Sequence, residues 1–148
     1  MRAVLGPLML LMACTRPPER VFVPGTPFKH LIEVRTSQGM TASVRMGEWL
    51  TLHGRRSTGP WVATERQSLG PDGCWVAPSP AEEEPEVADN LRWTTQPESK
   101  AEFNLGILDD HTRRVRFAVP GRYQLRATSS TWCSPPAGSN ELTVVVKE

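Results

Sequence analysis

Apolar and polar residues alternate in short runs along most of the chain, a pattern that predicts half-buried β-strands. The clearest run places Val115, Phe117 and Val119 on one face, with Arg114 and Arg116 on the other. Val, Thr and aromatic residues are frequent in these runs, and Gly, Pro, Asn and Ser separate them. No window shows the apolar stripe of a long helix. The predicted strands are Arg20–Val23, His30–Arg35, Thr41–Arg45, Glu48–Gly54, Trp61–Gln67, Leu91–Thr95, Ala101–Leu105, Thr112–Val119, Arg122–Ser129 and Glu141–Lys147.

The alternation also assigns a buried face to each strand. Tyr123, Leu125 and Ala127 point to the core, and the polar residues between them point to solvent. Two half-buried sheets that face each other satisfy this pattern. Pro120-Gly121, between two of the runs, predicts a type II turn in which Gly takes a positive φ. The other residues assigned to the core are Leu50, Leu52, Val115, Phe117, Val119, Leu142, Val144 and Val146.

The start of the chain has the composition of a secretory signal. Arg2 supplies a basic residue, residues 5–12 are apolar, and Ala13 is a small residue before Cys14. The apolar stretch is too short to span a bilayer. We therefore expect residues 1–13 to be removed, a short tether at residues 14–20, and a single domain at residues 21–148.

Leu11-Met12-Ala13-Cys14 also resembles the lipobox of bacterial lipoproteins, which consists of Leu, a variable residue, a small residue and Cys. The resemblance implies that Cys14 is lipidated, and several acyl chains on one residue anchor a domain firmly. It also implies a location in the cell envelope. Thr15, where some lipoproteins have Asp, favours the outer membrane, facing the periplasm or the cell surface. The alternative is an ordinary secretory signal that ends near a cysteine.

Lipidation of Cys14 would leave Cys74 and Cys133 as a pair in an oxidising compartment, where a disulfide is expected. Closing a loop of about 60 residues stabilises a fold by about 4 kcal/mol in the chain-entropy description. Zinc is the alternative partner for two cysteines, but no second pair and no nearby His has ligand spacing. We therefore predict a disulfide and no metal site.

Two segments resemble the last strands of bacterial Ig-like and PKD-like modules, namely Val119–Ala127 and Leu142–Val146. Val44–Leu52 resembles an earlier strand of these modules, and Leu91-Arg92-Trp93 resembles their central strand with its buried Trp. The resemblance covers residues 40–148. It implies an all-β, Ig-like antiparallel sandwich in which the Tyr123 hydroxyl returns to the backbone as a tyrosine corner.

Trp61 is the other candidate for the central-strand Trp. Trp93 is preferred because Phe103 and Tyr123 then follow at the spacing usual for these modules. This choice makes residues 55–90 a long loop insertion that contains Cys74, whereas Cys133 falls in the last hairpin loop. Those two connections share one end of an Ig-like sandwich, so the predicted disulfide is compatible with the fold.

The composition and motifs argue against several functions. The chain has 17 Lys+Arg and 16 Asp+Glu, whereas a nucleic-acid partner requires a basic surface. His30, His53 and His111 are scattered, and we interpret them as polar strand or turn residues. The chain has no Gly-x-Ser-x-Gly motif and no phosphate-binding Gly loop. We predict no catalytic residue, no cofactor and no enzymatic activity.

Two charged regions also need an interpretation. Residues 78–90 contain five acidic residues and no basic one, but lack the ligand spacing of a calcium loop, so we expect a solvated, partly disordered loop. The arginines near the C-terminal strands are assigned to two different sheets, which disperses their charge. These arginines are Arg113, Arg114, Arg116, Arg122 and Arg126.

Trp75 and Trp132 flank the two cysteines, and with Trp61 they would gather aromatic surface at the disulfide end of the sandwich. Loops on a rigid sandwich commonly carry binding sites, so these tryptophans form the candidate binding surface. The expected function is a non-enzymatic binding or structural module, attached to a membrane by its lipid, whose partner is an envelope protein or a glycan. The alternative is an inhibitor or accessory protein that contacts an envelope enzyme through the disulfide end.

Overall fold

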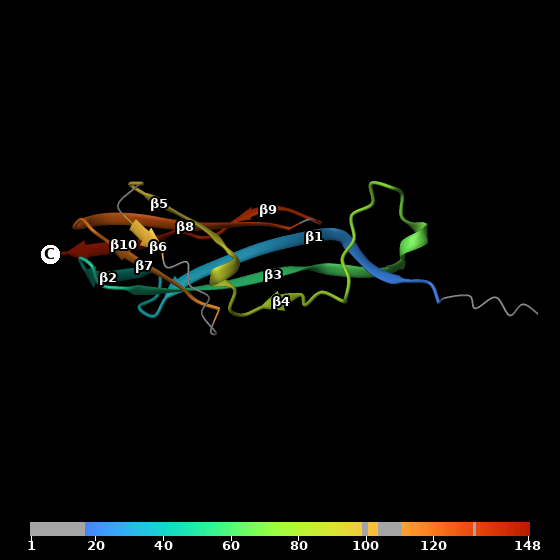
Figure 1. Cartoon of the computed structure of the whole chain (residues 1–148), viewed down its shortest axis with the longest axis horizontal. Helices are drawn as coiled ribbons and strands as arrows, with labels where there is room; N and C mark the ends of the chain where they lie inside the picture. Colours follow the sequence, from blue (N-terminus) through green and yellow to red (C-terminus); the bar gives the residue numbers. More distant parts are fainter. Residues whose placement is uncertain (1–16, 99–100, 104–110, 132) are drawn as a thin grey trace, which may run out of the picture.

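The computed structural model describes residues 17–98, 101–103, 111–131 and 133–148, and they form two β-sheets packed face to face (Figure 1). Sheet A has the order β1-β3-β7-β6, with β4 beside β3, and sheet B has the order β2-β10-β8-β5, with β9 beside β8. The predicted all-β sandwich is confirmed. The strands are β1 (Arg20–Thr36), β2 (Thr41–Arg45), β3 (Leu50–Glu65), β4 (Glu83–Glu84), β5 (Arg92–Gln96), β6 (Ala101–Phe103), β7 (Arg113–Phe117), β8 (Gly121–Thr131), β9 (Ser134–Gly138) and β10 (Leu142–Lys147).

The sheets are not entirely antiparallel, although the resemblance to Ig-like modules implied that they would be. β2 runs parallel to β10, with Thr41 opposite Thr143 and Arg45 opposite Lys147, whereas the other paired strands of the described residues are antiparallel. Two short 3-10 helices, η1 (Arg66–Ser68) and η2 (Ala88–Asn90), lie in the connection between β3 and β5. No helix of the described residues is long and apolar enough to cross a membrane.

A long antiparallel pair of strands, β1 and β3, dominates the shape of the molecule. We call this pair the β1–β3 hairpin, although β2 of sheet B lies between the two strands in the chain. The sequence predicted breaks at residues 24–29 and 55–60, but both strands continue, for 17 and 16 residues, with a register shift between Pro24 and Lys29. The break expected at the start of the 55–90 insertion is therefore wrong, because residues 55–60 continue β3, whereas residues 61–65 are strand as predicted. Prolines are tolerated here because β1 is an edge strand with an irregular register. We call residues 20–29 and 59–65 the hairpin arm; it extends beyond sheet B, away from the C-terminus (Figure 1).

The core lies between the sheets and contains most of the residues that alternation assigned to it. Phe117, Tyr123 and Leu125 are fully buried, but Val119 is 41% exposed, so its predicted inward orientation is wrong. β7 ends at Phe117, and the Val119 carbonyl instead accepts a hydrogen bond of 2.8 Å from the Tyr123 hydroxyl, as the tyrosine corner predicts. Gly121 has φ 151° and opens β8, so it does not form the predicted type II turn, which needs a φ near +80°.

The structure also decides which of the two candidate tryptophans, Trp61 or Trp93, belongs to the core. Trp93 is half-buried, packs against the core and donates from Nε1 to the Ala88 carbonyl at 2.9 Å. Trp61 lies on the hairpin arm, outside the main core cluster. Trp93 is thus the core tryptophan, although its strand, β5, is at the edge of sheet B.

Side-chain amides close two sheet edges. Val34 in β1 donates from its N–H to Asn140 Oδ1 at 2.8 Å and accepts from Asn140 Nδ2 at 2.9 Å. Ser43 in β2 makes the same pair of bonds with Gln38, at 2.9 and 3.1 Å. Each amide replaces a neighbouring strand, which satisfies the backbone and blocks pairing with another chain.

Gly54 in β3 allows the connection before β5 to pack closely on the sheet. A Cβ at this position would lie 2.7 Å from Leu91 Cδ1 and 3.1 Å from Ala88 Cα, and both neighbours are buried. Val87, immediately before η2, also donates its N–H to the Gly54 carbonyl at 2.9 Å. The position therefore requires a residue without a side chain.

We predict that Gly54→Ala lowers the free energy of unfolding by about 1–3 kcal/mol, because the added methyl group overpacks the contact with η2. Urea denaturation measures the change. Gly138→Ala is the matched control, since a methyl group added at this position of β9 would have no neighbouring atom within 4 Å. Equal stability of the two variants would show that the contact at Gly54 is not tight.

Candidate functional site

The acidic stretch of the chain is ordered along the edge of β3. In β4, Glu83 is opposite Ser57 and Glu84 is opposite Arg56. The Thr58 N–H donates to the Glu82 carbonyl at 2.8 Å, which extends the contact beyond β4. The expectation of partial disorder is therefore wrong for residues 82–87, which we call the acidic segment, although several of its side chains are solvated, as expected.

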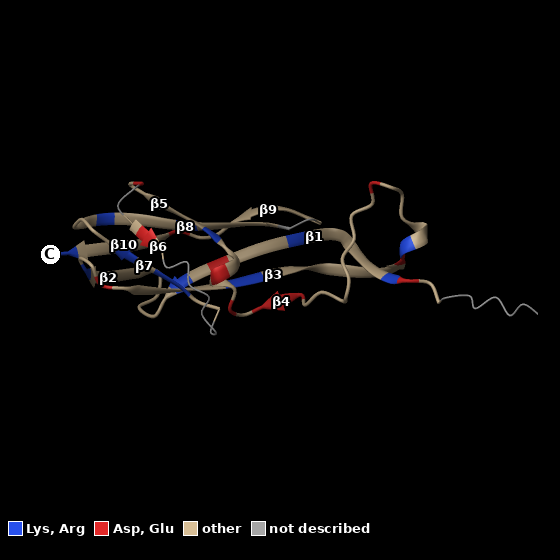
Figure 2. Ribbon diagram, in the orientation of Figure 1, with Lys and Arg blue, Asp and Glu red and all other residues tan. Residues whose placement is uncertain are grey.

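Opposite charges explain why this segment lies where it does. Glu83 forms an ion pair with Arg55, and Arg56 Nη2 lies 2.6 and 2.7 Å from the two carboxylate oxygens of Glu84. Glu86 lies 3.4 Å from His53 Nδ1. Figure 2 shows the acidic residues of β4 beside basic residues of β3. Sequence reasoning missed the contact because it counted the charges of the segment without those of the facing strand.

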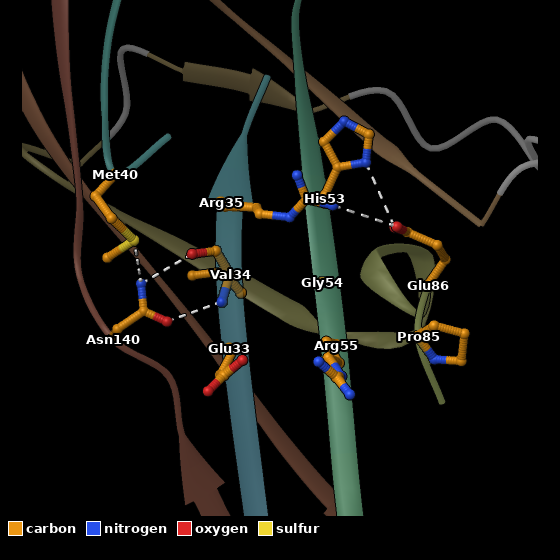
Figure 3. Close-up of a pocket in the computed structure, with 10 residues that line it drawn as sticks. All are labelled: Glu33, Val34, Arg35, Met40, His53, Gly54, Arg55, Pro85, Glu86 and Asn140. Carbon is orange, nitrogen blue, oxygen red and sulfur yellow. Dashed lines mark hydrogen bonds and ion pairs between the residues drawn. The ribbon is translucent and has the colours of Figure 1, made fainter. Parts of the chain in front are cut away.

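A pocket of about 490 Å³ lies on the outer face of the β1–β3 hairpin, between the acidic segment and the edge of β1 (Figure 3). Two cross-strand pairs flank its floor: Arg35 is opposite His53, and Glu33 is opposite Arg55. The pocket is lined by residues from five separate parts of the chain. The lining residues are Glu33, Val34, Arg35, Met40, His53, Gly54, Arg55, Pro85, Glu86 and Asn140.

Glu86 organises one wall of the pocket. Its Oε2 faces His53 at 3.4 Å, and its Oε1 faces Arg35 Nη2 at 3.8 Å. Glu33 has no ion-pair partner among the described residues, and Met40 adds an exposed apolar side chain. The lining includes no Ser, Thr or Cys. The arrangement is suited to holding a ligand by charge and hydrogen bonds, together with contact to the apolar surface that makes up most of the pocket.

The other histidines lie away from this pocket. His30 Nδ1 lies 3.0 Å from the Pro135 carbonyl and 3.2 Å from Ser134 Oγ, and so joins β1 to β9. His111 Nδ1 lies 3.5 Å from Asp89 Oδ2. His111 lines a second pocket together with Glu86, whereas neither His30 nor His111 lines the pocket that contains His53. The described part of the chain contains no group of three or more residues able to hold a metal ion.

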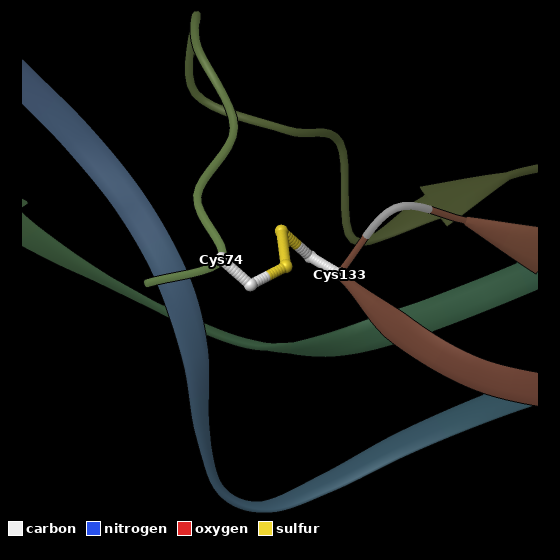
Figure 4. The surroundings of a disulfide bond; sticks show 2 residues. All are labelled: Cys74 and Cys133. Carbon is white, nitrogen blue, oxygen red and sulfur yellow. A yellow bond between two sulfur atoms is a disulfide. The ribbon is translucent and has the colours of Figure 1, made fainter. Parts of the chain in front are cut away.

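The predicted disulfide between Cys74 and Cys133 is present, with a Cα–Cα distance of 5.3 Å. Cys74 lies in the loop after η1, and Cys133 lies between β8 and β9 (Figure 4). Two residues after Cys74, Val76 exchanges two backbone hydrogen bonds of 2.9 Å with Phe22 of β1. The disulfide therefore connects the hairpin arm, through this loop, to sheet B.

The tryptophans proposed as a binding surface have separate contacts. The Trp75 ring packs under the Arg66 guanidinium at 4.5 Å. Trp61 meets Phe28 edge to face at 4.9 Å and donates from Nε1 to Thr58 Oγ1 at 3.2 Å. Trp132 and Cys14 lie outside the described residues. Within the described residues no ring contact joins Trp61 to Trp75, so a common aromatic cluster stays a prediction.

The arginines of the last strands are dispersed, as expected. β7 belongs to sheet A and β8 to sheet B. Arg116 pairs with Glu102 at 2.7 Å, and Arg126 pairs with Glu141 at 2.8 Å. These contacts do not form a continuous basic surface.

Comparison of the chain with protein-family models, with curated proteins and with solved structures finds no match. The function of the protein therefore has to be inferred from its own residues.

We predict that Glu84→Gln lowers the free energy of unfolding by about 1–2 kcal/mol, because Arg56, whose side chain is only 17% exposed, loses the carboxylate that both contacts its Nη2 and balances its charge. Glu102→Gln is the matched control: it breaks the solvated Arg116 pair, and we expect a loss below about 0.5 kcal/mol. Urea denaturation of both variants checks the difference. Equal losses would contradict a structural role for the acidic segment.

Proposed function

We propose that the protein is a lipid-anchored module of the cell envelope that binds a polar ligand without catalysing a reaction. The lipobox-like residues 11–14 support the anchor. The disulfide supports an oxidising compartment, because such bonds persist mainly outside the cytosol. Both features agree with a domain that is secreted and then held at a membrane.

The observation that carries the binding function is the pocket on the β1–β3 hairpin. Its floor is a regular pair of strands, and its wall is held by ion pairs and backbone hydrogen bonds. A concave site with several convergent polar groups on a rigid scaffold is the usual form of a binding site. Arg35 and Glu33 offer both signs of charge to the ligand.

The ligand class that fits this lining is a polar molecule with hydrogen-bonding groups, such as a glycan or an exposed segment of an envelope protein. Six of the ten lining residues carry a charged, imidazole or amide side chain, whereas most of the exposed surface of the pocket is apolar, of the kind that sugar rings and side chains both contact. Arg35, which is exposed and lies 3.8 Å from Glu86, can engage carboxylate or hydroxyl groups of a ligand, whereas Arg55 is already paired with Glu83.

A second function has support from the disulfide end. The disulfide and the Phe22–Val76 hydrogen bonds hold the loop that carries Trp75, and a fixed, half-buried Trp is a common anchor of protein interfaces. An inhibitor or accessory protein would use this loop to contact an envelope enzyme. The two functions therefore predict different contact surfaces on the same molecule.

We predict that an alkyne-tagged palmitate labels the protein in cells and that Cys14→Ser abolishes the label, because the cysteine sulfur carries the lipid. In-gel fluorescence after click chemistry measures the label. The unsubstituted protein should also remain with the membrane pellet. Labelling that persists in Cys14→Ser would contradict the anchor.

The binding surface is tested in the same cells with a photo-crosslinking amino acid at position 31, where the exposed Leu31 borders the outer face near the pocket. Position 130, on the outer face of β8, is the control. Discrete adducts at position 31 and none at 130 support the pocket. Adducts only from a label at position 75, to a single enzyme, would instead support the accessory protein.

A further inference from the structure

The chain enters the domain at the end of the hairpin arm. Arg66 donates its backbone N–H to the Glu19 carbonyl at 3.0 Å, and Arg66 Nη1 lies 2.8 Å from Glu19 Oε2. The same guanidinium covers the ring of Trp75. The exit point of the N-terminal tether is therefore fixed next to Arg66 and Trp75.

The tether is short compared with the molecule. Five peptide units separate Cys14 from Glu19, and a fully extended chain covers at most about 3.6 Å per residue, or roughly 18 Å in all. β3 alone has 16 residues, which at about 3.3 Å per residue span roughly 50 Å. An anchored Cys14 therefore keeps the end of the arm near the bilayer, whereas Trp49 lies at the other end of β3.

The side chains at this end are compatible with a membrane interface. The opposite end also has an arginine over an exposed tryptophan, with Arg116 4.7 Å from the Trp49 ring, so the tether is what favours the arm end. Val62 is 49% exposed, Trp75 is half-buried, and Arg66 places a cationic group over the indole ring. Trp and Arg each combine an apolar body with a polar end, and both are favoured at the level of lipid headgroups. The disulfide and the Phe22–Val76 pairing hold the Trp75 loop in place before any contact is made.

We propose that the arm tip, formed by Val62, Arg66 and Trp75, rests on the bilayer at headgroup depth while the lipid on Cys14 inserts beside it. This inference depends on the proposed lipid anchor. It gives the domain a direction: the arm contacts the membrane, and the end with the C-terminus points away from it (Figure 1).

The test uses the full lipidated protein, reconstituted into phosphatidylcholine–phosphatidylglycerol vesicles with and without brominated acyl chains, which quench nearby tryptophans. All variants carry Trp61→Phe, because Trp61 also lies on the arm; in this background Trp75→Phe should lower the quenched fraction of the fluorescence. Trp49→Phe, at the far end of β3, should raise that fraction, because it removes a tryptophan that the bromines do not reach. If Trp75→Phe and Trp49→Phe lower the quenched fraction by the same amount, the proposal is overturned.

A second pair of variants keeps the Trp75 indole and so excludes an effect of its removal on the local structure. Val62→Glu places a charge on the arm tip and should reduce quenching, whereas Met46→Glu changes a side chain of equal exposure, 49%, at the other end. Equal quenching in these two variants would also overturn the proposal.

Mass spectrometry of the same samples distinguishes failure of the lipid anchor on Cys14 from failure of the proposed contact between the arm tip and the bilayer. Acylated protein that floats with the vesicles but shows no quenching of Trp75 contradicts the inference alone. Protein without acyl chains, which stays in the soluble fraction, contradicts both the lipid anchor and the inference.

Discussion

The pairing of β1 with β3 is the interaction on which the rest of the structure depends. This hairpin forms the floor of the pocket, receives the acidic segment along one edge and carries the tether at its end. Its outer edge is closed by Asn140 and contacted by β9 through His30. Because every candidate functional feature is attached to it, a change in the position of the hairpin would move the pocket and the membrane-facing end together.

In the acidic segment, charge and apolar burial have different effects on position and stability. Most of its ion pairs involve solvated side chains, each of which contributes less than about 1 kcal/mol. Val87, its last residue, is almost fully buried, and Ala88, which follows it, is fully buried; burial of a Val side chain contributes about 1.5–3 kcal/mol. Apolar burial therefore supplies most of the stability, whereas the charges select the position of the segment along β3.

The strand faces could be predicted from the sequence because they follow a local two-residue period, as at Tyr123 and Leu125. The continuous hairpin could not, since the prolines at 24, 27 and 60 are local break signals that pairing with a distant strand overrides. β9 begins with Ser134-Pro135-Pro136 and was missed for the same reason. No local sequence pattern indicates the pocket. Its cross-strand pairs form only when β1 and β3 pair in the observed register, which brings together residues far apart in the chain. The disulfide was predictable because the lipobox-like motif accounts for Cys14, which leaves Cys74 and Cys133 as the remaining pair.

Hydrogen exchange in oxidised and reduced protein tests most directly whether the disulfide-linked loop holds the hairpin arm on the sandwich. In the oxidised protein, amides of the arm at residues 21–23 and 62–64 should be protected. In the reduced protein they should exchange much faster than amides of β8 and β10, because the loop no longer connects the arm to sheet B. An unchanged ratio between the exchange rates of the arm and those of β8 and β10 would contradict this account.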